Sequence, residues 1–370
     1  MSIESLKDKT VIAMSGGVDS SVSALLLKQQ NIDAVGVSMQ VWDYRNNGGC
    51  DSKATCCSPD DFTDARLVAS KIGIPYYVFD FEKVFKKEVI DKFISTYQEG
   101  ETPNPCVDCN NKVKFLELRN RAKSFGCKNV ATGHFARVKE TDQGFHLLRG
   151  VDSLKDQSYF LYGIKQDELS ETIFPVGEMT KEEVREKARE FGLNTAEKAE
   201  SQDICFVSGS LNNFLVKIGG IKNREGFVVD KDGKVLKSHE GIQNFTIGQR
   251  RGIGLGGTTE PYYVTDIQKE SNTIVVGPKK DLETEGFIIK DLNIVSPSLI
   301  NKLKDNSNFE IDCIAQLRHR HSGEKVKVVF ENGIATVKFL NSWAVVSPGQ
   351  AGVLYDLDNN EVLAGGRIDK

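Results

Sequence analysis

Eight cysteines give this 370-residue chain its widest range of possible chemistry. In a short secreted protein such a number would indicate disulfides, whereas in a reducing compartment it points to metal binding or catalysis. Cys106 and Cys109 form a C-x-x-C pair, which fits half a zinc site, a redox dithiol or, with Cys205, three ligands of an iron–sulfur cluster. Cys127 and Cys313 lie in apolar segments, so we expect small buried side chains there.

A second candidate for chemistry is the loop Ser15-Gly16-Gly17-Val18-Asp19-Ser20-Ser21, which lies between an expected strand and an expected helix. Backbone N–H groups and a helix N-terminus at such a place can receive phosphate oxygens, and glycines let an anion approach the main chain closely. Asp19 could hold a magnesium ion that bridges the phosphates. The loop lacks the lysine of the Walker A motif. The plainer alternative is a glycine-rich turn with a Ser or Asp helix cap.

The elements around this loop alternate between strand and helix. Apolar runs predict strands over 10–14, 33–40 and 76–79, and helical periodicity predicts helices over 20–30, 60–72 and 85–97. This alternation predicts an α/β fold with a doubly wound parallel sheet, in which ligands bind at the carboxyl ends of the strands.

After Cys205 the pattern changes to short alternating segments with Gly and Asp-Gly turns. In GFVVDKDGKVL the DKDGK turn predicts a hairpin. The segments GFIIKDLNIVS, FEIDCIAQLRH, EKVKVVFENGIATVKFL and AGVLYDLDNNEVLAGG read as consecutive strands, which suits a small barrel. We therefore predict an α/β domain over 1–210, a mostly-β central domain over 211–280 and a C-terminal β-barrel over 281–370.

Net charge and the distribution of apolar residues limit the classes of protein to which the chain can belong. A net charge of -4 neither requires nor excludes nucleic acid, because a basic face can exist on an acidic protein. No apolar run approaches the roughly 18 residues of a membrane span, and the N-terminus has no signal-peptide pattern. We expect a cytoplasmic protein with no membrane partner.

Three further motifs narrow the function: TPNPCVDCN at 102–110, ATGHFAR at 131–137 and SQDICF at 201–206. The loop resembles the SGGxDS loop of the ATP pyrophosphatase (PP-loop) superfamily, and together the motifs resemble the tRNA 2-thiouridylase family. The similarity continues through KDQSY at 155–159, FTIGQRRGIGLGG at 245–257 and SPGQ at 347–350, and so spans nearly the whole chain. Cys57 matches a cysteine that this family often has before its D-x-x-DA helix, whereas Cys50 and Cys56 are interpreted as loop residues rather than a weak metal site.

The resemblance implies an ATP-dependent enzyme that adenylates O2 of the wobble uridine of a tRNA, releases pyrophosphate, and exchanges the oxygen for sulfur with loss of AMP. Cys109 resembles the catalytic cysteine and Cys205 the cysteine that carries a persulfide from a sulfur-donor protein, either a persulfide carrier or a cysteine desulfurase. A persulfide is a good nucleophile, and the second thiolate can take up the outgoing sulfur as a disulfide. The implied cofactors are ATP and magnesium, the latter on Asp19.

The same resemblance assigns the remaining site residues. Those expected to bind ATP are Ala13, Met14, Ser15, Gly16, Gly17, Val18, Asp19, Ser20, Met39 and Gly133. Those expected to contact the tRNA are Asn104, Pro105, Cys106, His134, Lys155, Asp156, Gln157, Arg318, His319 and Gln350, with Arg250 and Arg251 in a second basic segment. Arginine suits phosphate, and histidine or glutamine can bond or stack on an unstacked base. The alternative for the basic run at 318–321 is a solvated strand end.

One position departs from the family pattern, because Cys106 stands where many members have an aspartate. Asp108 is near in sequence, but adjacent positions point differently. A persulfide route needs only Cys109 and Cys205, and we prefer it to a cluster on all three cysteines. The rival functions are another adenylating enzyme, such as an amidotransferase or a lysidine-type tRNA ligase, and a non-catalytic metal-stapled RNA-binding protein.

Overall fold

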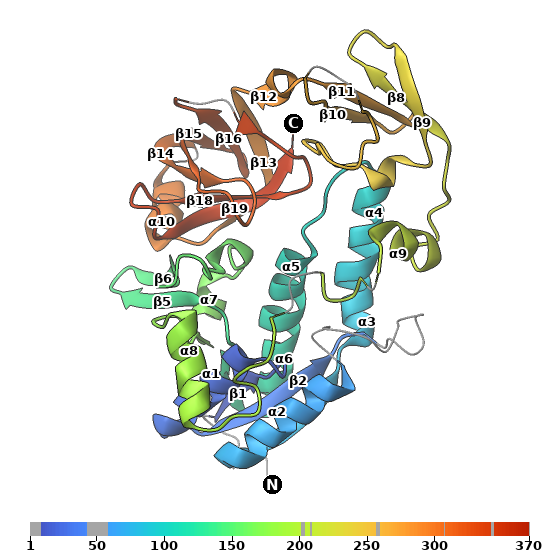
Figure 1. Ribbon diagram of the computed structural model, residues 1–370. Coiled ribbons are helices and arrows are strands. Elements are labelled where there is room, and N and C mark those ends of the chain that lie inside the picture. The colour runs from blue at the N-terminus through green and yellow to red at the C-terminus, as the bar shows by residue number, and fades with distance from the viewer. Residues whose placement is uncertain are drawn as a thin grey trace.

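The computed structural model describes residues 9–42, 58–200, 204–207, 209–256, 260–306, 308–341 and 344–369. Cys50, Cys56, Cys57 and residues 201–203 lie outside these ranges. Figure 1 shows an N-terminal α/β part, a β sheet at the upper right and a barrel at the upper left. No helix within the described ranges is long and apolar enough to cross a membrane.

The N-terminal sheet is parallel throughout and has the strand order β3-β2-β1-β4-β7. Its strands are β1 (Lys9–Ala13), β2 (Ala34–Gln40), β3 (Tyr76–Asp80), β4 (Cys127–Ala131) and β7 (Thr172–Ile173). Helices α1 (Val18–Gln29) and α2 (Pro59–Ile72) follow β1 and β2. The predicted fold class is therefore confirmed, with element boundaries within a few residues of those expected.

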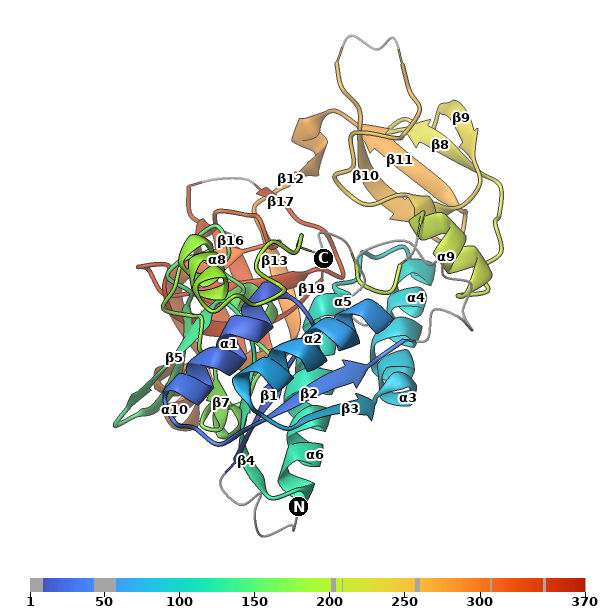
Figure 2. The same cartoon turned by 60° about the horizontal axis from the view of Figure 1, so that its bottom comes forward.

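Strands β1 and β2 are buried on both faces of this sheet, which explains their continuous apolar runs, whereas the edge strand β3 is partly exposed. Val11 and Ala13 face one apolar cluster, whereas Ile12 and Met14 face another, because successive side chains of a strand point to opposite sides. Helices α1, α2 and α8 (Lys181–Glu190) supply the second cluster, and Figure 2 shows α1 and α2 side by side across the sheet.

The opposite face is covered by two long helical segments. The first comprises α3 (Glu82–Phe85), the π-helical turn η2 (Lys86–Ile90) and α4 (Asp91–Gln98). The second comprises α5 (Pro105–Asp108), the π-helix η3 (Cys109–Glu117) and α6 (Leu118–Ser124). Pro105 occupies the first helical turn, where its missing N–H costs nothing. Widened π turns occur frequently at functional sites, and η3 begins at Cys109.

The second half is built mainly from strands. The central sheet has the order β10-β11-β8-β9, with β8 (Gly226–Asp230), β9 (Val235–His239), β10 (Tyr263–Gln268) and β11 (Thr273–Gly277). Strands β8 and β9 form the predicted hairpin, and Gly233 in its turn has a φ of 81°. The 3-10 helix η5 (Ile242–Asn244) follows β9, and helix α9 (Leu211–Lys217) precedes β8.

The C-terminal part is a closed barrel with the order β13-β16-β15-β14-β18-β19. Its strands are β13 (Gly286–Ile294), β14 (Asn308–Gln316), β15 (Glu324–Glu331), β16 (Ile334–Phe339), β18 (Ala351–Tyr355) and β19 (Val362–Asp369). Closure leaves no free sheet edge. A short pair, β12 (Glu283–Thr284) with β17 (Ala344–Val345), joins it to the connection from the central sheet, which contains η6 (Lys279–Leu282), and α10 (Pro297–Asp305) lies outside the barrel.

The barrel is fastened to the N-terminal part through Arg149, at the end of the hairpin β5 (Ala136–Thr141) and β6 (Gly144–Arg149). Its guanidinium donates to Gln316 Oε1 at 2.7 Å and to Asn359 Oδ1 at 2.9 Å, and it lies 3.7 Å from the centre of the Tyr355 ring. Asp156 Oδ2 accepts from the same guanidinium at 2.5 Å. The remaining short elements of this region are η4 (Ser158–Phe160) and α7 (Gln166–Leu169).

Candidate active site

A cavity of about 1100 Å³ lies where the barrel meets the carboxyl ends of β1, β2 and β4. We call it the cysteine cavity, because both Cys109 and Cys205 line it. The strand ends contribute Met14, Met39 and Thr132 to its wall, and the barrel contributes Gln316 and His319. This is the position at which open α/β sheets bind ligands.

The Ser15–Ser21 loop forms one end of the cysteine cavity. Ser15 N donates to Ser20 Oγ at 3.2 Å, and Ser21 Oγ donates to the Gly17 carbonyl at 2.8 Å, so the loop folds back on the first turn of α1. The N-cap residue Gly17 has no side chain with which to cap α1. Free amides at a helix N-terminus attract anions, so this end of the cavity suits a phosphate group.

Two glycines explain how the loop comes so close to its neighbours. Gly16 has a φ of 75°, and a Cβ built on it would lie 2.3 Å from the Asp61 carbonyl oxygen. A Cβ on Gly133 would lie 2.7 Å from Ser20 N, so only glycine lets the turn after β4 pack against the loop. The loop thus presents backbone amides and serine hydroxyls, which are the donor types that a phosphate group accepts from.

Of the residues predicted to bind ATP, those that line the cavity are Ala13, Met14, Ser15, Asp19, Ser20, Met39 and Gly133. Gly16, Gly17 and Val18 are not among the lining residues. Asp19, the predicted magnesium ligand, has its Oδ1 atom 2.6 Å from Lys181 Nζ. A carboxylate at this end of the cavity fits a magnesium ion, which would have to displace that ammonium group.

The sequence interpretation missed Lys181. It stands at the start of α8, and its ammonium group also lies 2.9 Å from Glu200 Oε1. Glu200 in turn binds Lys155 Nζ at 2.7 Å. The Thr180–Glu183 capping box marks this helix start in the sequence, but no pattern connects Lys181 with Asp19 across the intervening chain.

Cys109 and Cys205 reach the cavity from different elements. Cys109 begins η3 near the start of a long helical segment, whereas Cys205 lies in a turn after α8. Both are partly buried and pack against the apolar cluster that contains Phe206. Both are thiols, and no disulfide joins the cysteines of the described ranges. Cys127 and Cys313 are buried, as predicted, and burial raises the pKa of each thiol.

Cys106 is exposed and lines the cavity, but Asp108 does not. The Asp108 carboxylate turns toward Lys92, whose Nζ lies 2.6 Å away, and it therefore does not replace the aspartate that Cys106 displaces. Burial raises the pKa of Asp108, although the charge of Lys92 works in the opposite direction. Among the described residues, no group of three or more His, Cys, Asp or Glu is arranged to hold a metal. An iron–sulfur cluster on Cys106, Cys109 and Cys205 therefore has no support.

His134 is buried in the cavity wall, and its burial lowers its pKa well below the usual value. Lys114 Nζ lies 3.5 Å from His134 Nε2, and Thr132 Oγ1 lies 2.7 Å from Nδ1. An ammonium group can only donate, so Nε2 is the acceptor and Nδ1 carries the proton. His134 is thus a neutral group of fixed orientation.

The residues predicted to contact the tRNA fall into three sets: those that line the cysteine cavity, those that line a second cavity, and one residue that lines neither. Those in the cysteine cavity are Pro105, Cys106, His134, Lys155, Asp156, Gln157 and His319. Asp156 also has a structural part, since it accepts from Arg149 and from Ser158 Oγ. Asn104 lines neither cavity.

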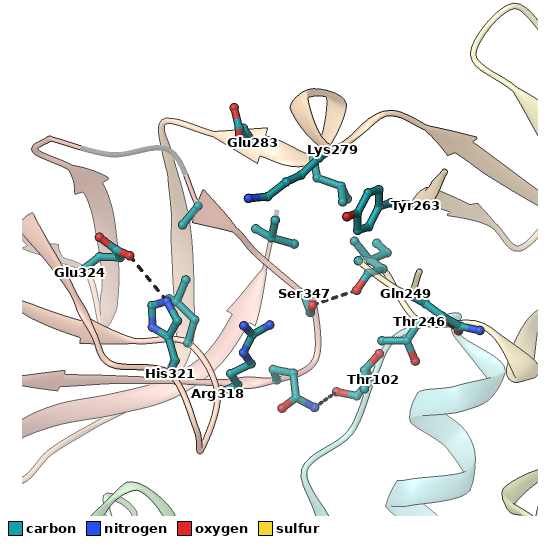
Figure 3. A pocket seen from close by; sticks show the side chains of 17 residues that line it. Thr102, Thr246, Gln249, Tyr263, Lys279, Glu283, Arg318, His321, Glu324 and Ser347 are labelled. Carbon is teal, nitrogen blue, oxygen red and sulfur yellow. Dashed lines mark hydrogen bonds and ion pairs between the residues drawn. The ribbon is translucent and has the colours of Figure 1, made fainter. Parts of the chain in front are cut away.

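Arg318 and Gln350 lie elsewhere, in a second cavity of about 640 Å³ between the central sheet and the barrel. Figure 3 shows Arg318, Lys279 and Tyr263 converging on this space, which we call the domain cavity. Gln350 Nε2 donates to the carbonyls of Thr102 and Pro103, so it also anchors the segment that leads to Cys106. His321 lines both cavities.

The parallel sheet with a glycine-rich loop at its carboxyl edge, followed by a small β sheet and a closed barrel, defines an α/β protein of three parts, and family profiles match the same three parts. The profile described as "tRNA methyl transferase HUP domain" matches residues 8–209, "tRNA methyl transferase PRC-barrel domain" matches 212–278, and "Aminomethyltransferase beta-barrel domain" matches 285–368.

Full-length relatives identify the family. The chain is 44% identical to the tRNA-specific 2-thiouridylase MnmA of Geobacter metallireducens, over 99% of this chain and 98% of that protein. It is 42% identical to the enzyme of that name from Clostridium perfringens, over 98% of each chain. For the Leptospira interrogans enzyme the identity is 41%, over 98% of this chain and 95% of that one. The chain belongs to the tRNA-specific 2-thiouridylase family.

Proposed function

We propose that this protein is a tRNA-uridine 2-sulfurtransferase that uses ATP to activate the base. The observation that carries the proposal is the cysteine cavity, in which the nucleotide loop residues Ser15 and Asp19 share one space with Cys109 and Cys205. Adenylation and sulfur transfer on one base require this sharing, because both reactions take place at the same C2–O2 bond.

In the first step, uridine O2 attacks the α-phosphate of ATP, the P–O bond to pyrophosphate breaks, and the base becomes an O2-adenylate. The loop amides and the start of α1 would hold the phosphates, and Asp19 would hold magnesium, which neutralises the departing charge when bound. Neutral His134 can donate through Nδ1–H only to Thr132, so it serves to position the wall near the base rather than as a proton carrier.

In the second step, the terminal sulfur of a Cys205 persulfide attacks C2, and AMP leaves with the former O2. The Cys109 thiolate then attacks Cys205 Sγ, the S–S bond to the base breaks, and 2-thiouridine is released together with a Cys109–Cys205 disulfide. A dithiol reductant must restore both thiols, which fits a reducing cytoplasm. The persulfide itself must come from a sulfur-donor protein, either a persulfide carrier or a cysteine desulfurase.

The direct test is mass analysis of nucleosides from tRNA incubated with the enzyme, ATP, magnesium and a persulfide donor. We expect 2-thiouridine that depends on ATP, with AMP and pyrophosphate formed in equal amount. Formation of ADP, or sulfur incorporation without ATP, would rule out this chemistry.

A further inference from the structure

Four side chains of alternating charge form a continuous line along one wall of the cysteine cavity. Lys155 Nζ lies 2.7 Å from Glu200 Oε2, Glu200 Oε1 lies 2.9 Å from Lys181 Nζ, and Lys181 Nζ lies 2.6 Å from Asp19 Oδ1. Lys155, Glu200 and Asp19 line the cavity. Lys181 lies behind them, with 10% of its side chain exposed.

The backbone holds the two lysines in fixed relation while their long stems remain adjustable. Asp152 Oδ2 accepts from the Lys181 backbone N–H at 2.9 Å, and the Asp152 carbonyl accepts from the Lys155 backbone N–H at 3.1 Å. Asp152 therefore joins the turn that carries Lys155 to the start of α8. Small movements of the ammonium groups can change their partners without moving the backbone.

The charges along this line depend on one another. Burial raises the pKa of Glu200, but hydrogen bonds from Lys155 and Lys181 more than offset this and lower it to about 2. Burial also raises the pKa of Asp19, with Lys181 opposing the effect. Removing Lys155 or Lys181 from Glu200 leaves a partly buried charge less compensated, and Glu200 then binds its remaining lysine more strongly.

We propose that the line Lys155–Glu200–Lys181–Asp19 couples RNA binding to nucleotide binding, so that each ligand increases the affinity for the other. This inference rests on the proposed function, with magnesium–ATP at Asp19, and on the expectation from the family resemblance that Lys155 contacts the tRNA. Lys181 is a positioning residue in this scheme, since it acts through the two carboxylates that it holds.

The sign of the coupling follows from the order of the charges. An RNA phosphate that takes Lys155 leaves Glu200 with Lys181 as its remaining partner, which draws Lys181 away from Asp19 and frees that carboxylate for magnesium. In the other direction, magnesium on Asp19 releases Lys181 to Glu200, which loosens the hold of Glu200 on Lys155. Both exchanges favour the doubly bound state, and thermodynamic linkage requires the two effects to be equal.

Titration calorimetry tests the coupling without turnover. The dissociation constant of a non-hydrolysable α,β-methylene analogue of ATP is measured with magnesium, in the absence and in the presence of saturating tRNA transcript. We expect the ratio of the two constants to be about ten in the native protein, within the usual range for coupled sites. In Glu200→Gln, which removes the central charge with little change of shape, the ratio should fall to about one, and tRNA alone should bind slightly more tightly because Lys155 is released.

Lys181→Met breaks the line at its buried member and should also bring the ratio to about one. If this variant does not fold, Glu200→Gln carries the test alone. Lys198→Met is the matched control, because Lys198 also holds two carboxylates, Asp61 at 2.7 Å and Asp64 at 2.5 Å, but does not line the cavity. Its ratio should stay at the native value.

A native ratio of one, or an unchanged ratio in Glu200→Gln, would overturn the inference. If thiolation is present and the ratio is unaffected by these variants, the coupling fails and the proposed function stands. If the tRNA does not bind and no 2-thiouridine forms, the proposed function itself fails.

Discussion

The cysteine cavity and the domain cavity differ in the partners of their lysine and arginine side chains. In the cysteine cavity, Lys155 is bound to Glu200 and Arg149 to Asp156. In the domain cavity, the ion pair among the described residues joins His321 Nε2 to Glu324 Oε1 at 3.7 Å, and neither Arg318 nor Lys279 belongs to it. A phosphate that binds Lys155 or Arg149 must displace a carboxylate, whereas one that binds Arg318 or Lys279 displaces none that the structure describes. Two carboxylates, Glu283 and Glu324, nevertheless line the second cavity as well. The first arrangement suits coupling and chemistry, and the second suits affinity.

The largest expected effect comes from the thiols of the cysteine cavity. Cys205→Ser should abolish sulfur transfer but leave adenylation intact, because adenylation requires no sulfur. Adenylated tRNA should accumulate and can be detected by mass analysis. Cys106→Ser is the control at the same cavity and should lose activity only modestly. Normal thiolation by Cys205→Ser would show that Cys205 is not the persulfide carrier.

The next largest effect concerns Asp19, at the end of the same cavity that the Ser15–Ser21 loop forms. Asp19→Ala should lower the rate of AMP formation about a hundredfold, because the magnesium ion and the phosphates lose a fixed ligand. The affinity for tRNA without ATP should change by less than about threefold, because Asp19 reaches Lys155 only through Lys181 and Glu200. Filter binding and AMP release measure the two quantities. A large loss of tRNA affinity would remove the distinction between the cavities.

A smaller effect should come from the domain cavity. Arg318→Ala should weaken tRNA binding about fivefold near 0.1 M salt and reduce the salt slope by about one, as expected for one lost phosphate contact. The rate of adenylation at saturating tRNA should remain native. Lys304→Ala, on α10, is a control outside both cavities. If Arg318→Ala lowers the saturated rate instead, the domain cavity takes part in the chemistry.

The smallest effect is on stability. Burial lowers the pKa of His134, so the unfolded chain binds a proton below about pH 6.5 while the native His134 stays neutral. Stability from this group is therefore complete above pH 6.5 and is lost as the pH falls from there toward the native pKa, by up to about 1.4 kcal/mol per pH unit. His134→Gln should flatten this dependence in urea unfolding measured between pH 7 and pH 5. An equal slope in both proteins would contradict the burial of a neutral imidazole.

The fold was predictable because its elements have strong local signals. Strand β1 is a short apolar run followed by glycines, and a sheet buried on both faces needs such runs. The long helix at 85–97 was predicted as one element, and its π-helical turn was not, because a π turn depends on packing rather than on sequence periodicity.

The site was predictable only in part, for a physical reason. Asp19 and the cysteines belong to local motifs, so their types and spacing could be read from the chain. Lys181 and Glu200 act through contacts between distant segments, and single charged residues on a helix and a loop carry no signal of such contacts. The separation of Arg318 from His319 into different cavities likewise depends on where the barrel strand ends, which the sequence does not specify.

The central claim is that the uridine oxygen leaves on the phosphate of AMP within the cysteine cavity. A tRNA transcript with ¹⁸O at uridine O2 tests it, with the enzyme, ATP, magnesium and a persulfide donor, followed by mass spectrometry of the AMP formed. We predict that the label is recovered in the phosphate of AMP, in an amount equal to the 2-thiouridine produced. Unlabelled AMP together with labelled water would contradict the account, because sulfur would then have displaced the oxygen directly as hydroxide, without adenylation.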